Sequence, residues 1–152
     1  MKKHLIILMF SLSLFADNYT YLVNEYTKET QLEAKIVIKI AKDIFKNKPI
    51  KLFIPDIKDL DKTVYSKEAI LVQSCQEADF VFKKYAKEYT CESTKNKPYL
   101  LTNNYKQLLV DKSYFGAFFW SKSRPNIVFI KDRLVQWNID LPNEYRQFIE
   151  DF

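Results

Sequence analysis

Histidine is almost absent from this sequence. The only one among the 152 residues is His4, which lies in a segment with the features of a secretory signal peptide. Once that segment is removed, the mature chain has no imidazole. Ser/His/Asp and Cys/His nucleophilic sites, histidine proton shuttles and ordinary zinc sites all need one. The composition therefore excludes these classes of enzyme and metal site.

Glycine is equally scarce, because Gly116 is the sole glycine of the chain. Loops that cradle a phosphate need several residues without a Cβ atom, so that the backbone can approach the ligand closely. Such a loop cannot be built here, which argues against nucleotide chemistry and any nucleotide cofactor. The two scarcities together favour a binding protein over a catalyst, and we expect no cofactor and no resident metal.

The N-terminus predicts export. Two lysines precede an apolar run at residues 5–10, and a stretch ending in a small residue follows, so residues 1–16 are interpreted as a signal peptide. The run is too short to span a bilayer. Leu14 departs from the small residue preferred near a cleavage site, and the alternative is an uncleaved anchor. We expect residues 17–152 to form one periplasmic α/β domain without stable membrane insertion.

The net charge and the residue composition also favour an exported bacterial protein. Removal of the predicted signal peptide takes away two lysines and lowers the net charge from +5 to +3. Nucleic-acid binding normally needs a concentrated basic face, so no nucleic-acid partner is expected. Only three of the 24 basic residues are arginine, which together with many Asn and Ile indicates an AT-rich bacterial genome.

Cysteine is limited to one pair, Cys75 and Cys91, 16 positions apart. In an oxidising compartment such a pair is most simply one structural disulfide. A redox site normally has C-x-x-C spacing, which this pair lacks. Free thiols are the remaining alternative.

Acidic residues are densest at Asp56, Asp59 and Asp61. Calcium prefers oxygen ligands of this kind, but Lys58 and Lys62 interleave them and the twelve-residue calcium-loop pattern is missing. A solvated loop is the preferred interpretation. A carboxylate pair could also serve a cell-wall hydrolase, because glycosidases need only two acids at a suitable separation.

The clearest predicted element is a helix over residues 30–46. Apolar residues recur every four positions at Leu32, Ile36, Ile40 and Ile44. This spacing creates one apolar helical face. Thr30 and Glu33 fit a capping box that would begin the helix there. The tyrosine-rich residues 17–27 are expected to form an arm or an edge strand.

The remaining pattern predicts an α/β fold with a mixed sheet of about five to six strands covered by helices. Short apolar runs that predict strands lie at residues 50–54, 69–72, 80–82 and 99–101. Asn103 and Asn104 suit the cap of a short helix. Residues 115–120 and 127–130 predict a β-hairpin. Pro142 suits the first turn of a closing helix.

The hairpin is also the candidate binding surface. Phe118 and Trp120 share one face of the predicted strand, so the aromatic rings are all buried only if both faces of the hairpin are covered. Aromatic residues flanked by Lys122 and Arg124 match the composition of interface hot spots. These four residues are the predicted partner-binding set, and a fully packed core strand is the alternative.

The order of elements resembles the periplasmic YfiR-like family. The resemblance rests on Gly116 followed by an apolar strand, a turn, Asn126-Ile127-Val128-Phe129-Ile130, Leu134, Ile139-Asp140-Leu141 and a closing helix, and on the helix at 30–46 running into residues 50–54. It covers about two thirds of the mature chain through element order alone, without a diagnostic motif. It implies a small α/β protein that regulates a membrane-bound partner by contact.

We therefore expect a non-enzymatic periplasmic interaction module, acting as a scaffold or regulatory subunit of an envelope assembly. In general character the chain is similar to small accessory proteins of envelope machines such as the flagellar-motor scaffold. The alternatives are a small-ligand binding or sensing protein and a carboxylate-dependent cell-wall hydrolase. Self-association stays open.

Overall fold

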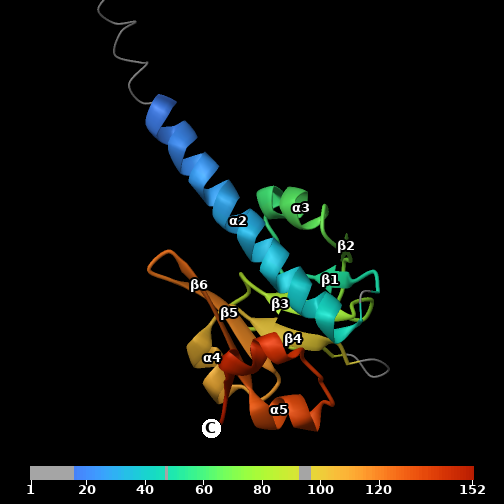
Figure 1. The fold of residues 1–152 in the computed structure, drawn as a ribbon. Helices are drawn as coiled ribbons and strands as arrows, with labels where there is room; N and C mark the ends of the chain where they lie inside the picture. The colour runs from blue at the N-terminus through green and yellow to red at the C-terminus, as the bar shows by residue number, and fades with distance from the viewer. Residues whose placement is uncertain (1–15, 47, 93–96) are drawn as a thin grey trace, which may run out of the picture.

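The computed structural model describes residues 16–46, 48–92 and 97–152, so nearly all of the predicted signal peptide lies outside the described residues. The elements are α2 (Ala16–Ile44), β1 (Lys51–Phe53), α3 (Asp59–Tyr65), β2 (Ile70–Leu71), β3 (Phe80–Lys83), β4 (Tyr99–Thr102), α4 (Tyr105–Val110), β5 (Gly116–Ser121), β6 (Arg124–Ile130), α5 (Lys131–Gln136), the 3₁₀ helix η1 (Asn143–Phe148) and β7 (Ile149–Glu150). Figure 1 shows their arrangement. None of the described helices is long and apolar enough to cross a bilayer.

The described strands form one mixed sheet of seven, in the order β2-β1-β3-β4-β5-β6-β7. The pairs from β2 to β5 are parallel, β5 and β6 form the antiparallel hairpin, and β6 pairs with β7 in parallel. The predicted α/β class is confirmed, with more strands than expected because β7 follows the closing helix. The carboxyl ends of β1, β3 and β4 lie at one edge of the sheet, where open α/β sheets usually place their sites.

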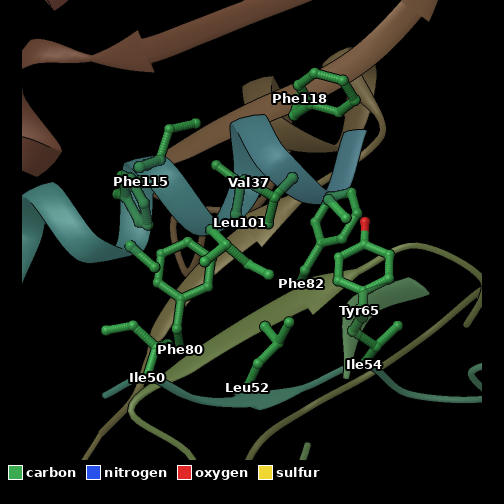
Figure 2. Close-up of a cluster of buried hydrophobic side chains, with 14 of the residues drawn as sticks. Val37, Ile50, Leu52, Ile54, Tyr65, Phe80, Phe82, Leu101, Phe115 and Phe118 are labelled. Atoms are coloured by element: carbon green, nitrogen blue, oxygen red, sulfur yellow. The ribbon is translucent and has the colours of Figure 1, made fainter. Parts of the chain in front are cut away.

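Helix α2 covers one face of the sheet (Figure 1). Its residues Ala34, Val37 and Ile38 are at most 1 % exposed and belong to the larger buried cluster. Figure 2 shows Val37 of α2 among buried side chains from β1, β3, β4 and β5, including Phe80. Burial of apolar area is the main force that holds the helix on the sheet.

Helix α2 begins 14 residues earlier than the sequence predicts. The expectation of an arm or edge strand at residues 17–27 is wrong, since these residues are helical. Once a helical turn exists, each added residue gains one hydrogen bond, and α2 contains no proline or glycine that would stop it. The predicted capping box at Thr30 and Glu33 is likewise wrong, because α2 does not begin there. Both residues lie in the middle of the helix, and both are buried. The N-terminal part of α2 extends beyond the sheet (Figure 1).

The second face of the sheet carries a smaller core. Val81, Ala117 and Val128 pack there with Leu108 of α4. Asn104 caps α4 as expected, since its side chain accepts a hydrogen bond from the Gln107 amide N–H. Val81, Ala117 and Leu108 are 0 % exposed, so α4 covers this face closely.

The predicted disulfide is confirmed. Cys75 and Cys91 are joined with a Cα–Cα distance of 6.0 Å, and both belong to or pack against the smaller core. The bond ties the loop after β2 to the loop after β3. It holds both loops against the smaller core.

The sole glycine lies where two elements approach closely. A Cβ atom at Gly116 would lie 2.5 Å from Cδ1 of Phe129 and 2.8 Å from the Val128 carbonyl oxygen. Both distances are far shorter than ordinary van der Waals contact. Gly116 is thus required for the close packing of β5 against β6.

The C-terminal segment differs in detail from the prediction. The closing helix after Pro142 is a 3₁₀ helix that buries Tyr145, and Ile149 leaves it to pair with Phe129 as β7. Helix α5 is tied to the end of α4 by Arg133, whose Nη1 donates to the carbonyl oxygens of residues 108, 111 and 114 at 2.6–3.0 Å. This buried guanidinium thereby holds the end of α4 and the loop between α4 and β5 against α5.

Candidate functional site at the β5–β6 hairpin

The hairpin turns through two residues. Ser121 pairs with Arg124, so Lys122 and Ser123 alone form the turn. Their φ angles are 49° and 59°, both in the left-handed region. Two-residue hairpin turns favour this geometry, but they normally use Asn-Gly, because a side chain with a Cβ atom is strained there by about 1–2 kcal/mol. The hairpin therefore holds two unfavourable residues at its most exposed point.

Phe118 is a core residue. Its side chain is 0 % exposed and meets Phe82 and Trp120 edge-on, at ring-centroid distances of 6.4 and 5.9 Å. The prediction that Phe118 contacts a partner is wrong, because the larger core already covers this ring. The base of the hairpin is covered on both faces, by the larger core with α2 on one side and by the smaller core with α4 on the other, whereas residues 121–125 at its tip are exposed.

Trp120 lies at the boundary between the core and the surface. The side chain is half-buried, and its indole Nε1 donates a hydrogen bond to Oε2 of Glu33 at 3.3 Å. Glu33 belongs to α2, so this bond joins the hairpin to the long helix. Trp120 is thereby held in one orientation, with part of its ring at the surface.

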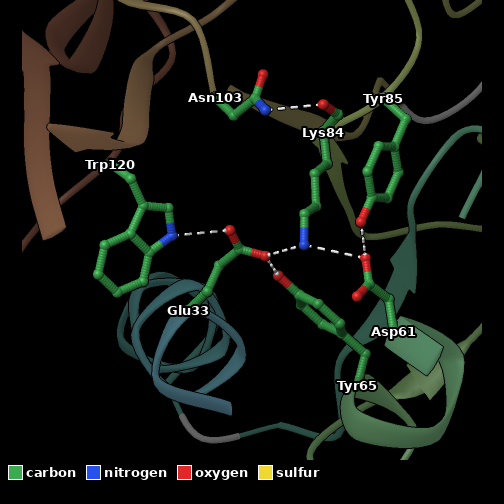
Figure 3. Close-up of polar contacts among 7 residues, drawn as sticks. All are labelled: Glu33, Asp61, Tyr65, Lys84, Tyr85, Asn103 and Trp120. Atoms are coloured by element: carbon green, nitrogen blue, oxygen red, sulfur yellow. Dashed lines mark hydrogen bonds and ion pairs between the residues drawn. The ribbon is translucent and has the colours of Figure 1, made fainter. Parts of the chain in front are cut away.

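Glu33 is the centre of a buried polar network (Figure 3). Its Oε1 accepts hydrogen bonds from the Tyr65 hydroxyl at 2.7 Å and from Lys84 Nζ at 2.6 Å. Both carboxylate oxygens are thus occupied, and Glu33 is only 3 % exposed. Buried carboxylates need such compensation, because removing a charge from water is costly unless it is paired.

Asp61 forms the other side of the network. Its Oδ2 accepts from Lys84 Nζ at 3.0 Å and from the Tyr85 hydroxyl, as Figure 3 shows. Asp61 is 0 % exposed, so the prediction of a solvated loop is wrong for this residue, although Asp56 and Asp59 are exposed as expected. The ion pair explains the difference, since Asp61 lies on the buried side of helix α3, where it meets Lys84.

The network contains two carboxylates and one ammonium group. Burial alone would lower the pKa of Lys84, but the charges and hydrogen bonds of Glu33 and Asp61 outweigh it and raise that pKa above its ordinary value. Burial, together with the charge of Glu33, raises the pKa of Tyr65 far above its usual range. Lys84 is therefore always protonated and Tyr65 always a donor at physiological pH. The arrangement fixes α2, α3, β3 and the hairpin relative to one another.

The two cations at the turn are exposed. In the part of the chain that the structure describes, neither the Lys122 nor the Arg124 side chain forms an ion pair or hydrogen bond. They stand at the tip of a hairpin that projects from the body (Figure 1). Pro125 follows on β6, where the outer edge has no neighbouring strand because β7 pairs only with Phe129 and Ile130. Proline at such a position blocks pairing with a foreign strand.

The role of the residues that support the hairpin was not predicted from the sequence. These residues come from three segments that only the fold brings together: α2 supplies Glu33, α3 supplies Asp61 and Tyr65, and the loop after β3 supplies Lys84 and Tyr85. One signal was available, because an acidic residue three positions after Thr30 lies on the apolar face of α2. Among the described residues, no group of His, Cys, Asp or Glu side chains is arranged to hold a metal ion.

In comparisons with protein-family models, with curated proteins and with solved structures, nothing matched this chain. The function is therefore argued from the geometry of the site.

Proposed function

We propose that this protein is a non-enzymatic periplasmic interaction module that docks an envelope partner through the tip of the β5–β6 hairpin. The contact set is Lys122 and Arg124 with the exposed part of Trp120. In this role the protein is a scaffold or regulatory subunit of a larger assembly, as the resemblance to YfiR-like proteins implies.

The observation that carries the proposal is the strained turn. Lys122 and Ser123 hold left-handed backbone conformations at an exposed tip where no packing requires their side chains. Strained residues are retained mainly where they serve a function. A turn chosen for stability alone would have the sequence Asn-Gly.

The support beneath the hairpin fits the same role. A half-buried tryptophan with its indole N–H bound to Glu33 presents a rigid ring edge, and little side-chain entropy is lost when a partner covers it. Unpaired cations beside it favour an acidic partner surface and speed the encounter. We infer a partner patch with carboxylates around a small apolar depression.

The test is recovery of the partner from living cells. The full chain with a C-terminal tag is expressed in its native bacterium, gently crosslinked and purified, and bound proteins are quantified by mass spectrometry. We expect one envelope protein at near-equal amount. The double charge reversal K122E/R124E is expected to lower its recovery by about tenfold or more, which corresponds to about 1.4 kcal/mol of binding free energy.

The matched control is K67E/K112E, which makes the same change of charge at two exposed lysines away from the hairpin. It should leave recovery unchanged. Recovery of the protein alone, or equal loss with both double variants, would contradict the proposal. Trp120→Ala is a poor test, since Trp120 also packs against the larger core and its loss would weaken the fold.

A further inference from the structure

A groove opens on the opposite side of the sheet from α2, at the carboxyl ends of β3 and β4. It has a volume of about 540 Å³ and lies between the loop at residues 84–87 and helix α4 with its preceding residues 103–104. Four of its lining residues are Lys83, Lys84, Lys87 and Lys106, and none is Asp or Glu. Because the Lys84 ammonium pairs with Glu33 and Asp61 on the other face of the sheet, the positive charge of the groove comes from the other three lysines.

Lys83 in the wall of this groove is a buried cation without an acidic partner. It is 3 % exposed, and its Nζ donates to the Lys87 carbonyl oxygen and to Gln107 Oε1, both at 2.7 Å. Among the ion pairs of the described chain, none involves Lys83. Asp111 and Glu88 act on it only at longer range. Besides the two oxygens, the Lys83 ammonium contacts the Tyr114 ring, 6.0 Å from its centroid, but no carboxylate, whereas buried charges are normally paired.

Two groups that line the groove, the Lys83 ammonium and the Gln107 amide, keep N–H donors without a hydrogen-bond acceptor among the described residues. An ammonium group has three N–H bonds, of which Lys83 uses two. Gln107 Oε1 accepts hydrogen bonds from both Lys83 Nζ and the Thr102 hydroxyl. Because an ammonium group cannot accept a hydrogen bond, the Gln107 amide is fixed with Oε1 toward Lys83 and Nε2 away from it. That Nε2 donates no hydrogen bond within the described residues.

The groove is also rigid. The Asn104 side chain accepts from the Gln107 backbone N–H at 3.2 Å, and Asn103 Nδ2 donates to the Lys84 carbonyl oxygen at 2.7 Å. Figure 3 shows the second of these bonds. The two walls are thus joined before any ligand arrives, and preorganisation of this kind lowers the entropic cost of binding.

We propose that this groove binds a compact oxyanion, the carboxylate or phosphate group of a small molecule, which pairs with Lys83 and accepts from Gln107 Nε2. Charge complementarity selects the ligand, because Lys83, Lys87 and Lys106 line the site without an acidic residue among the lining side chains. The volume suits a small molecule rather than a protein segment. Burial lowers the pKa of Lys83, and an oxyanion beside it would reverse that shift. The site is independent of the hairpin.

The test compares thermal unfolding of the full chain in sodium succinate, sodium phosphate and sodium chloride at equal ionic strength. A melting temperature that rises in succinate or phosphate above the chloride value supports the proposal. The salt that acts identifies the source, a carboxylate or a phosphate. The response should be lost in Lys83→Met and retained in Lys112→Met, an exposed lysine outside the groove.

A second variant keeps the test decisive if Lys83→Met folds poorly. Gln107→Glu places a carboxylate beside Lys83, so it should raise the melting temperature in chloride and abolish the response to both oxyanions. NMR of the Lys83 Cε protons should show the pKa of Lys83 rising when the effective salt is added to the wild type. Equal melting temperatures in all three salts, or an undiminished response in Gln107→Glu, would overturn the proposal.

Discussion

Lys83 and Lys84 are consecutive residues whose ammonium groups lie on opposite faces of the sheet, and only Lys84 is paired with carboxylates. Lys84 bridges Glu33 and Asp61 beneath α2, whereas Lys83 contacts a carbonyl and an amide oxygen beside α4. The alternation of side chains at the end of β3 produces this separation. One lysine therefore stabilises the fold, and the other is available to a ligand.

Loss of the Lys84 ammonium should be strongly destabilising. In Lys84→Met two carboxylates are left in a buried site without their cation, and such losses cost about 3–5 kcal/mol of unfolding free energy. Urea unfolding followed by circular dichroism measures the change. The control is Lys39→Met. Lys39 forms ion pairs with Asp43 and Glu144, but its side chain is 56 % exposed, so the loss of these pairs should cost under about 1 kcal/mol of unfolding free energy. A similar small loss for both variants would show that the buried network is not stabilising.

The pH dependence of stability should carry the signature of Lys83. Because burial lowers the pKa of Lys83 in the folded state, the unfolded chain binds more protons between that value and 10.5, and stability gained from this group rises with pH across that window. Lys84 has the opposite effect on the pH dependence of stability. Its pKa is raised in the folded state, so its contribution to the unfolding free energy is fully present below pH 10.5 and is lost as the pH rises through the raised pKa. The unfolding free energy of Lys83→Met minus that of the wild type should therefore fall as the pH rises toward 10.5. A constant difference would mean that the pKa of Lys83 is not lowered.

The disulfide should contribute to stability through the loop it closes. A bridge between residues 16 positions apart restricts the unfolded chain and is worth about 3 kcal/mol on the chain-entropy estimate. Urea unfolding with and without a reductant should show a loss of this size. The variant C75A/C91A should be insensitive to the reductant. If the wild type were equally insensitive, the bridge would not constrain the unfolded state.

The fold was largely predictable because its signals are local. The apolar runs that became β1 to β4, the Asn104 cap and the hairpin all depend on neighbours in sequence. The errors arose where local rules compete. Thr30 and Glu33 satisfy the rule for a helix start, but the helix continues upstream because nothing ends it. Residues after Pro142 suit a helix, yet Ile149 gains more by pairing with Phe129.

The site was only partly predictable because its supports are far apart in sequence. The sequence places Lys122 and Arg124 near a predicted turn, as the structure does, and their role in binding stays a prediction. The burial of Asp61 depends on Lys84, which is 23 residues away, and the orientation of Trp120 depends on Glu33, 87 residues away. No periodicity or spacing encodes such partners. Phe118 was misassigned for the same reason, since its burial depends on α2.

The most direct test of the docking hypothesis separates stability from binding at the turn. The variant K122N/S123G replaces two strained residues with the pair that this turn favours, so it should raise the unfolding free energy by about 1–2 kcal/mol. It also removes the Lys122 ammonium. Recovery of the envelope partner from crosslinked cells is the measurement. A more stable protein that recovers less partner is the predicted result. A more stable protein that recovers as much partner as the wild type would contradict docking through the hairpin tip.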